Sequence, residues 1–244
     1  MAFEAPLEAY NGKIKEVIIG KEGSTVTVGG ETALSFYTWE GKIPHKCAIA
    51  MEVFDVTPEG WPVAVVEPFK DVINDPIAWA VKCEKEYGAE MICLQLAGTD
   101  PNGLDKSPDE AASVVRSVLE KVSTPVIVYG SGNVSKDAEV MKKVAQAGEG
   151  FSLLIGPAVE DNYKQVAAAA LGYNHNVAAQ TPIDVNMAKQ LNILITQLGL
   201  DASKIVIDPS TGALGYGIEY TYSVMERLRL AALQQNDEMT QMPL

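Results

Sequence analysis

The sequence predicts an α/β protein with a parallel sheet, of the TIM or (β/α)8 barrel type and truncated after its sixth βα unit. Short apolar segments alternate six times with helical segments, in repeats of roughly 30 residues, the usual size of a βα unit. The apolar segments lack polar alternation, as in parallel strands covered by helices. An open doubly wound sheet is the alternative, but no G-x-G-x-x-G follows the first strand, and the even cadence favours the barrel.

A β-hairpin is expected before the first unit. IKEVIIG (14–20) and TVTVGG (25–30) are two short alternating runs, and the KEGS between them is a turn signal. We therefore divide the chain into an N-terminal hairpin and extension, residues 1–46, and an incomplete barrel domain, residues 47–244.

The six units have clear helix signals. Pro76 stands near the start of the first helix and Gly88 at its end, while Ser107, Pro108 and Glu110 form the pattern of a capping box. The expected strands are 47–55, 91–98, 125–132, 151–158, 176–182 and 204–209, and the expected helices are 75–88, 107–122, 135–148, 160–172, 183–199 and 218–234. The chain ends at QMPL (241–244), where a seventh strand would begin, so the barrel is expected to be incomplete.

Composition excludes several classes of partner. The net charge of −13, from 32 acidic and 19 basic residues, argues against nucleic acid and anionic membranes. The start has no basic n-region and no apolar h-region, so we expect no secretion signal, and no apolar stretch approaches the roughly 18 residues of a membrane helix. Cys47, Cys83 and Cys93 are widely spaced without a C-x-x-C, so we expect no metal site and a reducing, cytoplasmic location.

Candidate functional residues should follow the strands, because barrel enzymes place their sites on the loops at the carboxyl ends of the strands. Carboxylates, amides and hydroxyls dominate there, which suits hydrogen bonding to a polar heterocycle. These residues are Glu52, Asp55, Gln95, Asp100, Ser131, Asn133, Asn162, Gln180, Asp208, Ser210 and Thr211. His45, His175 and Lys204 precede strands, so they are expected at the opposite end, the histidines at the surface or in loops. No catalytic residue is identified.

Two glycine-containing loops stand out among these segments. GSGN (130–133), with Gly130 and Asn133, is either a phosphate cradle or a tight βα turn, and so short a motif favours the turn. The longer loop DPSTGALGYG (208–217) is the stronger candidate. Asp208 would accept N–H groups of a pterin-like ring, or it would simply cap the next helix. The glycines let the backbone approach a flat ligand closely. The candidates in this loop are Asp208, Ser210, Thr211, Gly212, Gly215, Tyr216 and Gly217.

Several long runs resemble one known family. They are TVTVGGETALSFYTWEG, MEVFDV, FKDVINDP, QLNILI, IVIDPSTGALGYGIEY and RLRLAALQ. In this order, from about residue 13 to the C-terminus, they are similar to the small subunit of the corrinoid iron–sulfur protein. Its archaeal counterpart is the delta subunit of acetyl-CoA decarbonylase/synthase.

The resemblance implies a (β/α)8 barrel related to pterin-binding methyltransferases. It implies a heterodimer with a large subunit that carries cobalamin and a 4Fe–4S cluster. Together the subunits would take a methyl group from a methyl-tetrahydropterin and pass it to acetyl-CoA synthase, with transient contacts to a methyltransferase and to acetyl-CoA synthase/CO dehydrogenase. This chain has no D-x-H-x-x-G and no cysteine set for a cluster, so alone it is expected to bind neither cofactor and to be inactive.

The nine candidate residues would then lie at the cobalamin interface with the partner. They are Asp208, Ser210, Thr211, Gly212, Gly215, Tyr216, Gly217, Gly130 and Asn133. Two alternatives remain open. One is a free-standing pterin enzyme of the dihydropteroate synthase or methyltetrahydrofolate methyltransferase type. The other is a purely structural subunit, in which the residues at the mouth of the barrel, at the carboxyl ends of the strands, contact only protein.

Overall fold

The computed structural model describes residues 6–244, and residues 1–5, the start of the predicted N-terminal extension, lie outside the described residues. The first two strands, β1 (Glu16–Ile19) and β2 (Val26–Gly29), form the expected antiparallel hairpin. The other six form one parallel sheet in which each strand pairs with the next along the chain. They are β3 (Ala50–Phe54), β4 (Met91–Gln95), β5 (Val126–Tyr129), β6 (Leu154–Ala158), β7 (Asn176–Gln180) and β8 (Ile205–Asp208).

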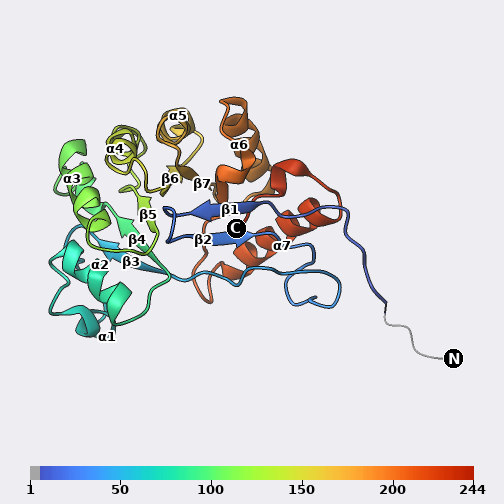
Figure 1. Cartoon of the computed structure of the whole chain (residues 1–244), viewed down its shortest axis with the longest axis horizontal. Coiled ribbons are helices and arrows are strands. Elements are labelled where there is room, and N and C mark those ends of the chain that lie inside the picture. The colour runs from blue at the N-terminus through green and yellow to red at the C-terminus, as the bar shows by residue number, and fades with distance from the viewer. Residues whose placement is uncertain (1–5) are drawn as a thin grey trace.

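This strand order decides between the two architectures. A doubly wound sheet reverses its strand order at a switch point, whereas β3 to β8 run strictly in sequence. A helix follows each strand, and Figure 1 shows α2 to α6 in an arc outside the strands, with the hairpin on the inner side. These helices are α2 (Pro76–Lys85), α3 (Pro108–Leu119), α4 (Val134–Ala147), α5 (Tyr163–Tyr173), α6 (Val185–Gln197) and α7 (Ile218–Leu233). The barrel-type fold with six βα units is therefore confirmed.

Local capping explains where the helices begin. The Asp75 carboxylate accepts the N–H groups of Ile77 and Ala78, and Ser107 with Glu110 forms the predicted capping box of α3. One short helical segment between β3 and α2 was not predicted from the sequence. There, α1 (Val63–Val66) runs into a 3₁₀ turn, η1 (Glu67–Phe69). Its four-residue length leaves no periodicity to detect.

The sheet separates two apolar cores because successive strand residues point to opposite faces. On the outer face, Leu94, Val128 and Ile207 pack among the helices in the large core that contains the buried Trp79. On the inner face, the residues near the start of the strands pack against the hairpin. This smaller core joins Val17 and Ile19 of β1 to Met91, Leu154 and Ala178. The hairpin therefore closes the amino-terminal end of the inner face.

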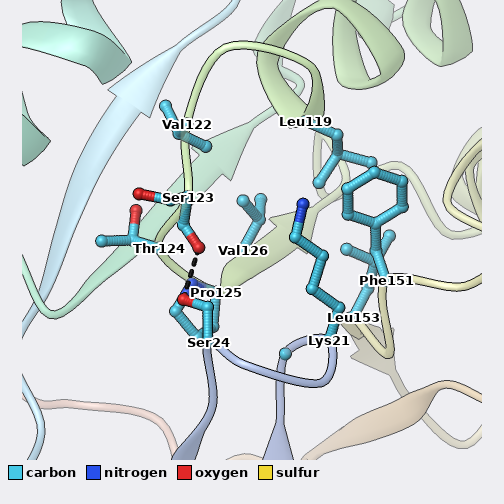
Figure 2. Close-up of a pocket in the computed structure, with 11 residues that line it drawn as sticks. Lys21, Ser24, Leu119, Val122, Ser123, Thr124, Pro125, Val126, Phe151 and Leu153 are labelled. Atoms are coloured by element: carbon cyan, nitrogen blue, oxygen red, sulfur yellow. Dashed lines mark hydrogen bonds between the residues drawn. The ribbon is translucent and has the colours of Figure 1, made fainter.

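The turn of the hairpin is fastened to the loops beneath the sheet, as Figure 2 shows. Ser24 Oγ donates to the carbonyl of Ser123 at 2.5 Å, and the ammonium of Lys21 lies 4.8 Å from the centre of the Phe151 ring. Gly20 has a φ of 107°, and a Cβ there would lie 2.7 Å from Pro125 Cγ, so no other residue fits without rearrangement.

His175 corrects the expectation that both histidines lie at the surface or in loops. It does precede β7, at the amino-terminal end of the sheet, but it is fully buried. The Leu153 N–H donates to Nδ1 at 3.1 Å, and Nε2 lies 2.8 Å from the Ala145 carbonyl, to which it donates. Two backbone partners thus satisfy a neutral imidazole. Burial lowers the pKa of His175 below its ordinary value.

Within residues 6–244, none of the helices has the length and apolar character required to cross a bilayer.

A neutral buried histidine makes stability depend on pH. Because the folded pKa of His175 is lowered, the unfolded chain binds the extra proton as pH falls below about 6.5. The stabilisation from His175 should be fully present above that pH and should be lost below it. We expect the difference in unfolding free energy between wild type and His175→Gln to shrink by up to about 1.4 kcal/mol per pH unit. Denaturant unfolding of both proteins between about pH 5 and 8 measures this difference as a function of pH.

His45→Gln is the matched control, because the His45 side chain is 31% exposed near Glu16. Its difference from wild type should change less with pH than that of His175→Gln. A difference for His175→Gln that is constant across this range would contradict the assignment.

Candidate functional site

The carboxyl ends of three strands are tied together by Asp208, the last residue of β8. Its Oδ2 accepts hydrogen bonds from the Tyr129 hydroxyl and from Gln180 Nε2, both at 2.9 Å. Its Oδ1 accepts the Ser210 N–H at 2.9 Å. Tyr129 ends β5 and Gln180 ends β7. One carboxylate therefore fixes the relative positions of three strand ends and of the loop that follows β8.

Small residues on the two intervening strands allow the Tyr129 side chain to extend from β5 to Asp208 on β8. Between β5 and β8, the inner face carries Gly156 on β6 and Ala178 on β7. A Cβ at Gly156 would lie 2.9 Å from that of Ala178, so the space beside Tyr129 has no room for a larger residue. Burial and the adjacent Asp208 carboxylate raise the pKa of Tyr129. The tyrosine stays protonated and remains a donor.

The GSGN loop after β5 is a tight turn around a buried carboxylate. The N–H groups of Ser131 and Gly132 donate to Asp137 at 2.8 and 2.9 Å. A Cβ at Gly130 would lie 2.3 Å from the Asp137 carboxyl carbon, and Asn133 caps α4 by accepting the Lys136 N–H. These are the groups that a phosphate would need, so the geometry favours the turn. A ligand contact by Gly130 or Asn133 stays a prediction.

The loop 208–217 is folded onto its own backbone. Gly212 donates its N–H to Thr221 Oγ1 at 2.8 Å, and Ser210 Oγ donates to the Thr181 carbonyl at 3.0 Å. A Cβ at Gly212 would lie 2.3 Å from the carbonyl carbon of Gly217. The glycines thus allow a close approach, as expected, but the approaching group in the structure is the chain itself.

The tip of this loop projects apolar groups into solvent. Leu214 is 90% exposed and Tyr216 is 88% exposed, and Thr211 and Gly215 are exposed with them. Residue 217 is the N-cap of α7, so the alternative that Asp208 caps this helix is wrong. Asp208 instead orders the loop from its base while the apolar tip stays free.

The predicted residues thus fall into two neighbouring loops joined through the Tyr129–Asp208 hydrogen bond. One loop contains Asp208, Ser210, Thr211, Gly212, Gly215, Tyr216 and Gly217, and the other contains Gly130 and Asn133. Tyr129 and Asp137 were not predicted from the sequence. In the sequence, Tyr129 looks like an ordinary strand residue. Its alternation with Ile127 on β5 nevertheless predicts that its side chain lies on the inner face of the barrel.

A second buried carboxylate organises the loop after β4. The Asp55 side chain is fully buried, accepts the Gly98 N–H at 2.7 Å and pairs with Lys106 Nζ at 3.1 Å. Lys106 also donates to the Asp55 carbonyl. Asp55 is therefore occupied in holding the loop and is not free for a ligand.

Cys93 and Glu52 lie on the inner face, paired in register on β4 and β3. Burial, with the charges of Glu52 and Asp208, raises the pKa of the Cys93 thiol to about 12. Burial also raises the pKa of Glu52. Cys93 is thus a thiol at neutral pH and a poor nucleophile. Across residues 6–244, no group of three or more histidine, cysteine or acidic side chains is placed to hold a metal ion.

The fold is an incomplete parallel barrel that is similar to the barrel of a solved dihydropteroate synthase. The structure of the Xanthomonas albilineans dihydropteroate synthase with 4-aminobenzoic acid is similar, with a TM-score of 0.51 at 15% sequence identity. The similarity covers 75% of this chain and 68% of that enzyme, and at this identity it concerns the fold alone.

The chain belongs to the family described as CO dehydrogenase/acetyl-CoA synthase delta subunit, whose model matches residues 16–244. Three relatives named acetyl-CoA decarbonylase/synthase complex subunit delta come from Methanocaldococcus jannaschii, Methanothermobacter thermautotrophicus and Archaeoglobus fulgidus. They are 42%, 43% and 40% identical over 99%, 99% and 97% of this chain. The aligned regions cover 61%, 62% and 54% of the relatives, so the chain spans little more than half of their length.

The close packing of Gly212 on Gly217 makes the loop sensitive to one methyl group. Gly212→Ala should push the loop open, because the new Cβ would overlap the backbone of Gly217. We expect chymotrypsin to cleave the variant several-fold faster at Leu214 and Tyr216. Gly103→Ala is the control at the same end of the sheet, where a Cβ would have its nearest neighbour at 3.6 Å. Equal cleavage rates in the two variants would refute this packing argument.

Removing Lys106 would leave the Asp55 carboxylate buried without its partner. We expect Lys106→Met to lower the unfolding free energy by about 3–5 kcal/mol, the usual cost of an uncompensated buried charge. The double variant Asp55→Asn/Lys106→Met should recover part of that loss. Denaturant unfolding of both variants makes the comparison, and a double variant no more stable than the single one would count against the ion pair.

Proposed function

We propose that this chain is the barrel of a small subunit that joins a large subunit carrying cobalamin and a 4Fe–4S cluster. Together they take a methyl group from a methyl-tetrahydropterin and pass it to acetyl-CoA synthase. Family membership supports the assignment to the complex. A role close to the methyl-carrying cobalt is supported by the geometry at the mouth of the barrel. There, the Asp208 network orders a loop whose Leu214 and Tyr216 side chains remain exposed.

The loop tip suits one face of a corrinoid. A corrinoid is a flat macrocycle with apolar faces and amide groups at its rim. Leu214 and Tyr216 provide apolar contact area, and Gly215, with a φ of 79°, lets the backbone turn without a side chain in the way. The corrinoid, when bound, supplies the methyl-carrying cobalt chemistry. The residues of this chain position the ring and keep water from its face.

The iron–sulfur cluster does not fit this chain. Cys47 is exposed on the segment before β3, Cys83 is buried in α2, and Cys93 lies on the inner face of β4. Since a 4Fe–4S cluster takes four cysteine ligands, we place it on the partner. All three thiols are free, which suits a reducing compartment, and we place the complex in the cytoplasm.

The first turns of α7 extend the apolar surface of the loop tip. Ile218, Tyr220, Tyr222 and Met225 are all exposed there. Aromatic residues and methionine are enriched at protein interfaces, so this surface suits a lasting contact with the large subunit. The methyltransferase and acetyl-CoA synthase/CO dehydrogenase would bind more briefly.

A free-standing pterin enzyme is the second candidate, and one observation favours it. Asp208 is a carboxylate at the mouth of a barrel similar in fold to dihydropteroate synthase. This candidate predicts that the chain binds a pterin tightly without a partner. A purely structural subunit predicts instead that changes at Asp208 alter assembly but leave the rate of methyl transfer unchanged.

Purification of the full-length native protein under anaerobic conditions tests the proposal. A complex with a larger subunit, with corrinoid and iron–sulfur absorbance, supports the methyl-carrier function. A colourless protein without partners that binds a pterin would overturn it in favour of the free-standing enzyme.

The exposed tip should matter for methyl transfer and not for folding. We expect Leu214→Ser/Tyr216→Ser to slow methylation of the corrinoid in the complex by about tenfold or more, as for the loss of a strong interface contact. Its unfolding midpoint should match wild type, because both side chains are almost fully exposed.

Leu171→Ser/Leu198→Ser is the matched control, since these side chains are exposed on α5 and at the end of α6. Stopped-flow absorbance of the complex gives the rate. Equal rates for the two double variants would show that the loop tip does not contact the corrinoid.

A further inference from the structure

The inner surface of the mouth presents hydrogen-bond acceptors. It is formed by Gln95, Tyr129, Gln180 and Asp208, which end β4, β5, β7 and β8, and we call these four residues the acceptor floor. They alternate onto the inner face with the residues that pack on the hairpin. The floor therefore lies above the hairpin and beneath the loop 208–217.

The orientation of both glutamine amides follows from their partners. Gln95 Nε2 donates to the Gly130 carbonyl, and Gln180 Nε2 donates to the Asp208 carboxylate. Both partners are acceptors, so the nitrogen, and not the oxygen, must face them. Neither Oε1 receives a hydrogen bond from residues 6–244, and neither is among the buried side-chain atoms without a partner. Both oxygens thus keep some accessible surface and have no donor among the described residues.

Asp208 and Tyr129 also direct acceptors into the mouth. A carboxylate has about four acceptor positions, and Asp208 uses three of them, for Tyr129, Gln180 and Ser210. The Tyr129 proton is committed to Asp208, so its oxygen can only accept from a ligand.

The charges around the floor do not favour an anion. Lys106 pairs with Asp55 at 3.1 Å, and Lys136 pairs with Asp105 at 2.6 Å. Both lysines stand at the starts of helices on this side of the sheet, and both are neutralised. Glu52 adds a carboxyl group to the same inner face. A phosphate or carboxylate would therefore meet further oxygen atoms. Among the described residues of these two loops, both lysines are already paired with carboxylates.

We propose that the acceptor floor binds primary amide or amino N–H groups on an uncharged part of the ligand. Within the function proposed above, on which this inference rests, two sources have this chemistry. They are the amide side chains at the rim of the corrinoid and the aminopyrimidinone ring of the pterin. A ligand without these N–H groups leaves the floor unpaired and loses affinity, because buried acceptors need donors.

Paired probes test the inference on the full-length complex freed of corrinoid. In the corrinoid arm, dicyanocobinamide carries side-chain amides, whereas heptamethyl cobyrinate carries esters that cannot donate. In the pterin arm, methyl-tetrahydropterin is compared with its 2-deamino analogue. We expect dissociation constants from absorbance titration to favour the donor-bearing probe by about 10- to 100-fold in one arm, which identifies the source.

The variant Gln95→Met/Gln180→Met removes two of the four acceptors at nearly constant volume and should lower that ratio, while Tyr129 and Asp208 remain. Asn102→Met makes the same amide-to-thioether change at an exposed loop residue and should leave the ratio unchanged. Should the double variant fail to fold, Gln95→Met alone leaves every donor to Asp208 in place, and it should still lower the ratio.

The outcomes separate this inference from the function that it deepens. Equal affinity for the two members of the pair in both arms, or an unchanged ratio in Gln95→Met/Gln180→Met, overturns the acceptor floor alone. Failure of every corrinoid and pterin probe to bind wild type and Asn102→Met overturns the proposed function together with it.

Discussion

The hydrogen bonds of the Asp208 carboxylate are the interaction on which the mouth of this barrel depends. Parallel strands define a surface but not the positions of the loops beyond it. By accepting from Tyr129, Gln180 and Ser210, one side chain connects three strand ends and sets the path of the next loop. The same bonds orient the Gln180 amide, so the polar character of the floor follows from the contacts that build the loop.

The two ends of the sheet are specialised in opposite ways. At the amino-terminal end, the hairpin fills the inner face with Val17 and Ile19 and is fastened by Ser24 to the loop beneath β5. At the carboxyl end, buried Asp55 and Asp137 hold the backbone of two loops and leave the floor open. This division agrees with the placement of function in barrel enzymes.

Much of the fold was predictable because its causes are local. Apolar runs, proline at the first turn and the Ser107–Glu110 box each act within a few residues, so strands and helices could be placed from the sequence. The site was harder to predict, because its interactions join distant segments. Nothing near Tyr129 indicates that its hydroxyl meets a residue 79 positions away, and nothing near His175 shows that Ala145 and Leu153 will bury it. Asp208 was found only because it ends an apolar strand.

The attachment of the hairpin has a consequence for the order of folding. Each barrel strand pairs with its neighbour in the chain, so the sheet can grow unit by unit as synthesis proceeds. The segment before the hairpin can complete its packing only after the last helix has been synthesised. The Gly12 N–H donates to the Leu233 carbonyl, and the Lys15 N–H donates to the Gln241 carbonyl. Contacts of such sequence separation form late. A segment that is synthesised before the barrel is therefore among the last to complete its packing.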